Sequence, residues 1–226
     1  MMKQQLSPIF AVMCTLMAVC LVASNIFTTK VFSVAGLPLT GDLLIFPVSY
    51  ILNDCISEVY GFKKARFAIW MSFTVNFLFV IFAQIVAALP GASFWEGGEH
   101  FNYIFRMEIW VALASLLAFL AGSTINAAVM SKMKVADKGR RFWLRAILSS
   151  FAGDLCDSLV FMPIVFWSVG FRKLIMMILC QVGVKVLYET LCLPLTQRVV
   201  KAVKTKDATD VYDDGISYNP FGFKDL

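Results

Sequence analysis

Histidine is almost absent from this sequence, and charge is scarce. His100 is the one histidine among 226 residues, and 15% of the chain is charged. Haem ligation, histidine metal sites and histidine-driven catalysis within a helical bundle therefore have no candidate residue. The phosphate-binding pattern G-x-x-x-x-G-K-S/T is also missing, which argues against ATP hydrolysis by this chain. The six cysteines fall in apolar stretches without metal-ligand spacing, as is typical of packing residues. We expect no cofactor and no metal.

Long apolar stretches make up most of the chain. Hydrophobic residues account for 59% of it, including 21 Phe, and stretches of about 18 or more apolar residues are typical of transmembrane helices. Six such stretches lie at residues 7–29, 41–60, 65–89, 108–130, 143–169 and 173–198. The sequence thus predicts an all-α integral membrane protein with six transmembrane helices. We assign residues 1–203 to the transmembrane domain and residues 204–226 to a polar, solvated cytoplasmic tail.

The basic residues predict the orientation of these helices. Fourteen of the 20 Lys and Arg fall at the ends of the chain or in the loops expected on the same side, and four fall on the other side. By the positive-inside rule, both termini lie in the cytoplasm, as expected for a multi-pass protein of the inner membrane. This topology accounts for the net charge of +5. Membrane lipid is therefore an expected partner, and nucleic acid is not.

Seven charged residues interrupt the apolar stretches. An unpaired charge at the centre of a bilayer costs about 3 kcal/mol on insertion scales, so these residues need a compensating role. They are Asp54 and Glu58 in the second stretch, Arg145, Asp154 and Asp157 in the fifth, and Lys185 and Glu189 in the sixth. The helical rise places Asp54, the two acids of the fifth stretch and Lys185 near the midplane of the bilayer.

The spacing of these charges indicates which of them share a helix face. Residues three or four apart lie on one face, so the acids of the second stretch form one acidic stripe and those of the fifth form another. These four acids outnumber the nearby cations, which favours a functional role for them. Lys185 and Glu189 have the spacing of an intrahelical ion pair, for which we favour a structural role. Arg145 lies near the cytoplasmic end, and its side chain is expected to extend to the interface.

Prolines and helix direction add a second pattern. Pro47, Pro163 and Pro194 interrupt the three charged stretches and free backbone carbonyls, as in broken helices that line a cavity. The first three stretches and the last three have opposite orientations, and the middle helix of each half combines an acid pair with a proline. This arrangement favours a 3+3 inverted repeat with a substrate site at the midplane.

The segment IFPVSYILNDCISEVYGFKKAR, residues 45–66, resembles the signature of the queuosine precursor transporter family, also called vitamin uptake transporter-like. The matching residues are Phe46, Pro47, Tyr50, Asp54, Glu58, Val59, Tyr60 and Gly61. The resemblance continues through SNIFTTK, GDLCDSLVF and VKVLYETLCLPL, so it covers nearly all of the membrane part. Asp154 departs from the pattern, since many members have a longer acid or an amide at that position.

This resemblance implies a transporter rather than an enzyme. The expected transporter imports queuosine precursors, which are 7-deazaguanine bases such as preQ0, preQ1 or queuine. A carboxylate can accept two N–H donors from the edge of a guanine-like ring, and aromatic side chains can stack on its face. The resemblance therefore implies a midplane site of carboxylates and aromatic residues for a small-molecule substrate. The candidate substrate-binding residues are Asn25, Tyr50, Asp54, Glu58, Tyr60, Asp154, Asp157, Ser158, Lys185 and Glu189.

Two other classes of protein share part of the pattern. An intramembrane aspartyl protease also has two aspartates on separate helices, and AGD at residues 152–154 resembles part of its G-x-G-D motif. Phe151 stands where the first glycine is required, and Tyr50 is not adjacent to Asp54, which disfavours a protease. A structural scaffold has no need for surplus buried carboxylates.

The energy source for transport remains open at the level of sequence. The chain could be a uniporter, a proton-coupled carrier, or the substrate-binding subunit of a multi-component vitamin importer with a separate ATPase. A homodimer is likewise an open alternative.

Overall fold

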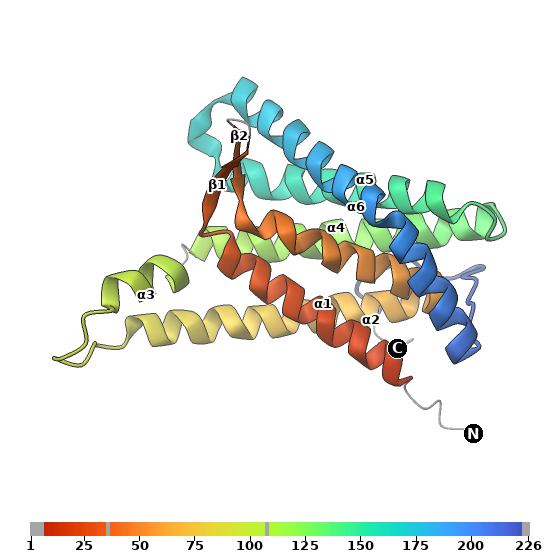
Figure 1. The fold of residues 1–226 in the computed structure, drawn as a ribbon, viewed down its shortest axis with the longest axis horizontal. Helices are drawn as coiled ribbons and strands as arrows, with labels where there is room; N and C mark the ends of the chain where they lie inside the picture. The colour runs from red at the N-terminus through yellow and green to blue at the C-terminus, as the bar shows by residue number, and fades with distance from the viewer. Residues whose placement is uncertain (1–6, 35–36, 107–108, 223–226) are drawn as a thin grey trace.

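The computed structural model describes residues 7–34, 37–106 and 109–222. In this part of the chain, helices form one elongated bundle (Figure 1). The long helices are α1 (Pro8–Phe27), α2 (Phe46–Ala88), α4 (Ile109–Ala136), α5 (Phe142–Val165) and α6 (Phe171–Asp207). The shorter elements are α3 (Gly98–Phe105), the 3-10 helices η1 (Gly41–Leu44) and η2 (Trp167–Val169), and the antiparallel strands β1 (Val31–Val34) and β2 (Leu37–Thr40).

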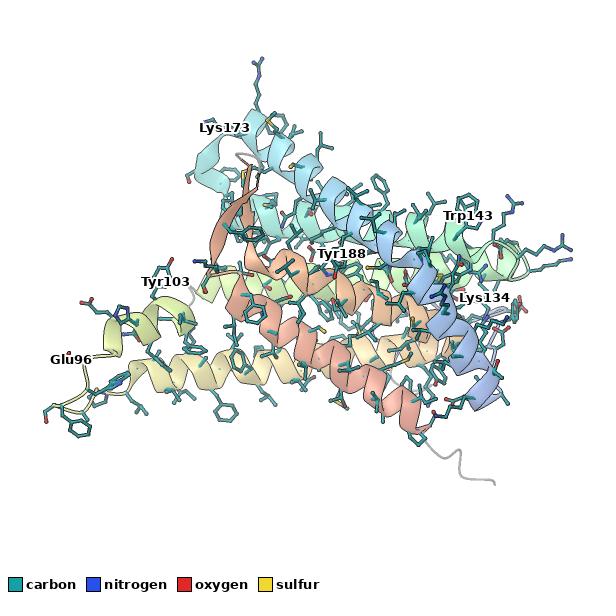
Figure 2. All side chains as sticks on the ribbon, in the orientation of Figure 1. Glu96, Tyr103, Lys134, Trp143, Lys173 and Tyr188 are labelled. Atoms are coloured by element: carbon teal, nitrogen blue, oxygen red, sulfur yellow. The ribbon has the colours of Figure 1, made fainter. Side chains whose placement is uncertain are left out.

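Different elements lie at the two ends of the bundle. The β1–β2 hairpin and α3 lie at one end, where α6 also begins, and we call it the hairpin end (Figure 1). α1 begins and α6 finishes at the opposite end, which we call the tail end. Figure 2 shows Lys173 extending away from the bundle at the hairpin end, whereas Lys134 lies among other side chains at the tail end.

Five helical segments in the described residues are long and apolar enough to cross a membrane. The second and third predicted stretches are joined within α2, which is 43 residues long. The fifth predicted stretch is too long by a few residues, because α5 ends at Val165 and η2 follows it. The predicted domain boundary after residue 203 falls inside α6, which continues to Asp207.

α2 contains a break at Gly61, whose dihedral angles (φ 80°, ψ 173°) are not helical. A positive φ is readily adopted by glycine, because the Cβ of other residues clashes with the backbone there. Both ends of α2 lie at the hairpin end, so the arms before and after Gly61 run in opposite directions (Figure 1). A Cβ at this position would also lie 2.7 Å from an Asp213 oxygen. Gly61 therefore allows both the reversal and the close approach of another segment.

The three prolines of the charged helices have different roles. Pro47 lies in the first turn of α2, where the missing N–H has no helical partner to lose. It therefore starts this helix, and the prediction that it interrupts the span was wrong. Pro163 and Pro194 do lie inside α5 and α6, where each removes one backbone hydrogen bond.

Residues 208–222 pack against the break in α2 through a few residues, while most of the segment remains exposed. The Asp213 side chain is 7% exposed, and its Oδ2 accepts hydrogen bonds from the Phe62 N–H at 2.7 Å and the Ser131 hydroxyl at 2.5 Å. Phe62 is the first residue of the second arm, and a carboxylate is stabilising at the start of a helix. The Val211 N–H donates to the Val59 C=O at 3.1 Å. The tail thus satisfies backbone groups that the break leaves without helical partners.

The contacts continue along the tail. Arg66 donates to the backbone C=O of Asn219 at 2.8 Å, and the Trp70 indole donates to the C=O of Pro220 at 2.7 Å. The rings of Phe62 and Tyr218 lie 4.9 Å apart. Residues 211–220 are therefore fixed to the second arm of α2 along about two turns of helix.

Replacing Asp213 by Ala is expected to lower the free energy of unfolding by about 1.5 to 3 kcal/mol, because the Phe62 N–H loses a charged acceptor in a buried position. Thermal unfolding of the purified protein in detergent measures this effect. Asp214→Ala is the matched control, since Asp214 is the exposed neighbour. Equal melting temperatures for the two variants would show that Asp213 does not cap this helix.

Candidate functional site

A narrow cleft with a cavity volume of about 10 Å³ lies between α2, α5 and α6. Its polar lining includes Asp54 from α2, Ser150 from α5, and Glu189 and Thr190 from α6, and the remaining walls are mostly aliphatic. Two carboxylates on facing helices thus share one small cleft. Apolar walls with a few convergent polar groups are typical of small-molecule sites, although in this conformation the cleft has room for about one water molecule.

Asp54 is held in place by neutral hydrogen-bond donors. Its Oδ1 accepts from the Asn126 amide at 3.0 Å and from the Ser149 hydroxyl at 3.3 Å. Asn126 is in turn oriented by Asn53, which donates to Asn126 Oδ1 at 2.7 Å and to the Ser123 C=O at 2.9 Å. The bonds to Asp54 use one carboxylate oxygen, and an ionised carboxylate can accept about four hydrogen bonds. Asp54 therefore retains acceptor capacity, although it is buried, with 3% of its surface exposed.

Two glycines bring α4 and α5 into backbone contact beside this site. A Cβ at Gly122 would lie 2.8 Å from the Gly153 C=O, and a Cβ at Gly153 would lie 2.9 Å from the Gly122 C=O. Either Cβ would also collide with the Tyr50 side chain. Glycine at both positions thus lets α5 approach α2 and α4, which places Asp154 and Asp157 beside Tyr50.

Lys185 pairs with the acids of α5 rather than with Glu189. Its Nζ donates to Asp157 at 3.0 Å, lies 3.7 Å from Asp154 Oδ1, and lies 4.1 Å from the centre of the Phe46 ring. The predicted intrahelical pair with Glu189 was therefore wrong. The predicted proximity of Lys185 to the two acids of the fifth stretch is confirmed.

Several buried polar groups around the cleft lack hydrogen-bond partners among the described residues. They include both carboxylate oxygens of Asp154 and of Glu189, and the hydroxyls of Tyr50 and Ser158. Buried polar atoms normally have partners, and unsatisfied ones call for an explanation such as a ligand or a functional proton. We call Asp54, Asp154, Asp157, Glu189 and Lys185 the acidic cluster.

Glu58 belongs to a different cluster at the tail end. Arg145 donates to both of its oxygens, at 2.9 Å from Nε and 2.8 Å from Nη2, and Lys204 donates to Oε1 at 2.6 Å. Arg145 also binds Asp137 at 3.1 Å and is 1% exposed. The prediction that Arg145 extends to the interface was therefore wrong, because a fixed bidentate partner holds it inside the bundle.

Lys134 joins the tail to this second cluster. Its Nζ donates to the backbone C=O of Glu58 at 2.5 Å and to that of Val211 at 2.6 Å, and it pairs with Asp210, which also pairs with Lys204 at 2.8 Å. Partial burial raises the pKa of Asp210, but hydrogen bonds from Lys134 and Lys204 outweigh it and hold this pKa below its usual value. We call Glu58, Asp137, Asp210, Lys134, Arg145 and Lys204 the paired cluster.

Of the ten candidate residues, Asp54 and Glu189 line the cleft and the others do not. Two of these others, Asn25 and Tyr60, contact different helices. Asn25 donates to Asn76 at 2.8 Å and accepts from Ser115 at 3.0 Å, so it links α1, α2 and α4. Tyr60 donates to Asp207, and its ring lies 5.1 Å from that of Phe10. Both side chains make contacts that hold helices together, and they remain predictions as ligand contacts.

Sequence reasoning missed the amides and hydroxyls that hold Asp54. Asn53, Asn126 and Ser149 are each fully buried, yet none is charged, so a search for intramembrane charges passes over them. A buried asparagine within an apolar stretch is a weak signal by itself. Asn53 and Asn126 become informative only when packing brings their side chains together.

A family model described as "Putative vitamin uptake transporter" matches residues 40–199. The chain belongs to this family. The resemblance seen in the sequence is thereby confirmed, and with five segments of transmembrane length the chain is a multi-pass protein of the inner membrane.

Two curated relatives support membership of the vitamin uptake transporter family. Over 146 residues the chain is 28% identical to the probable queuosine precursor transporter of Bacillus subtilis (strain 168), with 64% of each chain covered. Over 148 residues it is 26% identical to the queuosine precursor transporter of Escherichia coli (strain K12), with 64% of this chain and 63% of the relative covered. The match thus spans slightly less than two thirds of each relative. No solved structure matches the chain at a significant level.

Proposed function

We propose that this chain imports queuosine precursors, 7-deazaguanine bases such as preQ0, preQ1 or queuine, across the inner membrane. The observation that supports this most directly is the cleft between α2, α5 and α6, where Asp54 and Glu189 face each other without a cation bonded to either in the described residues. Family membership supports transport, and the names of the two relatives support this substrate class.

The chemistry of the cleft suits such a ligand. A guanine-like edge offers adjacent N–H donors, which a carboxylate can accept in pairs, and a cationic amine on the ligand would pair with a second carboxylate. We propose Asp54 and Glu189 as the groups that contact the ligand. Tyr50 and Ser158 offer further unsatisfied hydroxyls, and Asp157 and Lys185 form an ion pair behind them. For Glu58 we propose a structural role in the paired cluster.

Ligand entry requires helices to separate, because the site is closed in this conformation. Asp54 and Glu189 are 3% and 6% exposed, and Tyr50 and Asp154 are fully buried. Pro163 and Pro194 interrupt the hydrogen bonding of the two helices that face α2 across the cleft, which makes these helices the elements that can bend. We propose that bending of α5 and α6 opens the cleft.

We also propose that the chain crosses the membrane six times, with both termini in the cytoplasm and lipid against its exposed apolar surface. The two antiparallel arms of α2 supply two crossings, and the tail end holds most of the basic residues. Single cysteines at position 97 and at position 136 test this orientation. An impermeant thiol reagent added outside should label position 97, and labelling of position 136 instead would reverse the topology.

Uptake of a labelled 7-deazaguanine base into vesicles containing the purified protein tests the proposed function. Uptake should exceed that of protein-free vesicles and should be competed by the unlabelled base but not by adenine. Equal uptake by both kinds of vesicle would refute it. An intramembrane aspartyl protease is the alternative with the same residues, and cleavage of a model transmembrane substrate that is lost in Asp154→Ala would favour it.

A further inference from the structure

The two clusters of buried charge differ in their balance. The paired cluster contains three acids and three cations, and each acid has a cation within 4.0 Å. The acidic cluster contains four carboxylates, Asp54, Asp154, Asp157 and Glu189, and one cation, Lys185. If all of its members were ionised, the acidic cluster would have a net charge of −3.

Such a net charge cannot be buried in a membrane protein without compensation. Each unpaired ion costs several kcal/mol even after relaxation of its surroundings, and Asp154 and Glu189 receive no hydrogen bonds from the described residues. A metal cation does not suit the site, since no group of three His, Cys, Asp or Glu residues in the described chain has a metal-binding arrangement. Protons bound to the carboxylates satisfy the same charge balance and need no coordination geometry.

Two hydroxyls give an independent indication of a small ligand at this position. Tyr50 is fully buried and Ser158 is 1% exposed, and neither hydroxyl has a hydrogen-bond partner among the residues described. A Cβ placed on Gly122 would touch both the Tyr50 hydroxyl and Asp157 Cβ, so this hydroxyl lies beside the acids of α5. A protonated carboxyl group would supply donors that an ionised one lacks.

Asp154 is the member of the cluster whose ionisation would most directly change the pairing of Lys185. It lies 3.7 Å from Lys185, which donates its shorter bond to Asp157 at 3.0 Å, so one cation serves two carboxylates. The titratable groups that interact with Asp154 are Tyr50 and Asp54 on α2, Asp157 on α5, and Lys185 and Glu189 on α6. Asp42 of η1 lies near Lys185, and the neutral Asn126 of α4 donates to Asp54. The acids among these groups disfavour a full negative charge on Asp154.

Resting on the proposed transport function, we infer that Asp154 binds a proton from outside and releases it to the cytoplasm with each substrate molecule that enters. While Asp154 is protonated, Lys185 pairs with Asp157 alone, and the carboxyl group is neutral. When the proton leaves, the Asp154 carboxylate competes for Lys185, and the ion pair between α5 and α6 rearranges. These are the two helices that the prolines allow to bend, so protonation of Asp154 is coupled to the movement that opens the cleft.

The test uses the purified full-length protein in liposomes clamped at zero membrane potential. Exchange of labelled for unlabelled preQ0, with no gradient of any ion, reports transport itself. Net accumulation of preQ0 with the outside one pH unit more acidic reports proton coupling. One proton per substrate predicts about tenfold accumulation, because one pH unit is a tenfold ratio of proton concentrations.

Asp154→Asn should reduce the accumulation ratio to about one, whereas Asp154→Glu, which keeps a carboxyl group, should retain most of it. Glu99→Gln is the matched control, since Glu99 lies on the exposed surface of α3, and its ratio should equal that of the parent. Parent protein that exchanges preQ0 but does not accumulate it in a pH gradient overturns the proton inference, as does accumulation driven by a sodium gradient instead. Parent protein that shows no exchange overturns the proposed function itself.

Discussion

Replacing Asp54 by Asn is expected to weaken binding of a 7-deazaguanine base about ten- to a hundredfold, with membrane abundance near normal. The new amide can keep its oxygen toward Asn126 and Ser149, which now donate to Asp54 Oδ1. Its NH₂ group then faces the ligand in place of a carboxylate oxygen. Loss of one charge-assisted hydrogen bond costs about 1.5 to 3 kcal/mol, which corresponds to that range of affinity.

Equilibrium binding of labelled base to the purified variants measures the effect, and uptake into vesicles measures its consequence. Asp214→Asn makes the same chemical change at an exposed position of the tail and should bind like the parent. Ser57→Ala controls for any disturbance of α2 close to Asp54. If Asp54→Asn and Glu189→Gln both bind and transport like the parent, the ligand does not occupy this cleft.

Replacing Arg145 by Ala is expected to destabilise the protein by about 3 to 5 kcal/mol, the usual effect of leaving one partner of a buried ion pair without the other. Glu58, which is 1% exposed in the parent, would lose both guanidinium bonds and keep the bond from Lys204. The sequence predicts a smaller loss here than for Lys185→Ala, on the assumption that Arg145 reaches the interface. Because Arg145 and Lys185 both belong to buried ion pairs, the structure removes the reason for expecting a smaller loss at Arg145.

Thermal unfolding and membrane abundance of the two variants decide between these expectations. Arg140→Ala is the control, since Arg140 is exposed close to the start of the same helix. Adding Glu58→Gln to Arg145→Ala should restore part of the lost stability, because it removes a buried carboxylate that has lost its two guanidinium bonds. A double variant no more stable than Arg145→Ala would indicate that Arg145 contributes by packing, and not by pairing with Glu58.

Some features of the site follow from the chain alone because they depend on spacing along one helix. The apolar stretches give the helices, the helical rise gives the depth of Asp54, Asp154 and Lys185, and the signature around Asp54 gives the family. Each of these is a local property, or a count along a single stretch. The meeting of Lys185 with the acids of α5 also followed, since groups at one depth in a small bundle have few other partners.

The choice among partners depends on packing between helices, which spacing does not determine. Lys185 and Glu189 have ideal spacing for a pair, yet Lys185 donates to Asp157 on the neighbouring helix α5. Arg145 sits at a depth compatible with the interface, and only the fold brings Glu58 to it. The sequence alone places Lys134 among several basic loop residues. In the structure, its ammonium group bonds to the backbone of Glu58 and to the tail.

The capping of α2 by the tail has a consequence for how the protein is made. The Phe62 N–H and the Asp213 side chain that accepts its hydrogen bond are separated by 151 residues. At about 5 to 20 residues per second, a ribosome needs roughly 8 to 30 seconds to synthesise that interval. For this time the turn at Gly61 exists without its carboxylate, and the nascent helices must be held by the membrane and by one another. A segment that is synthesised late, residues 211–220, therefore completes one of the first hairpins to enter the bilayer.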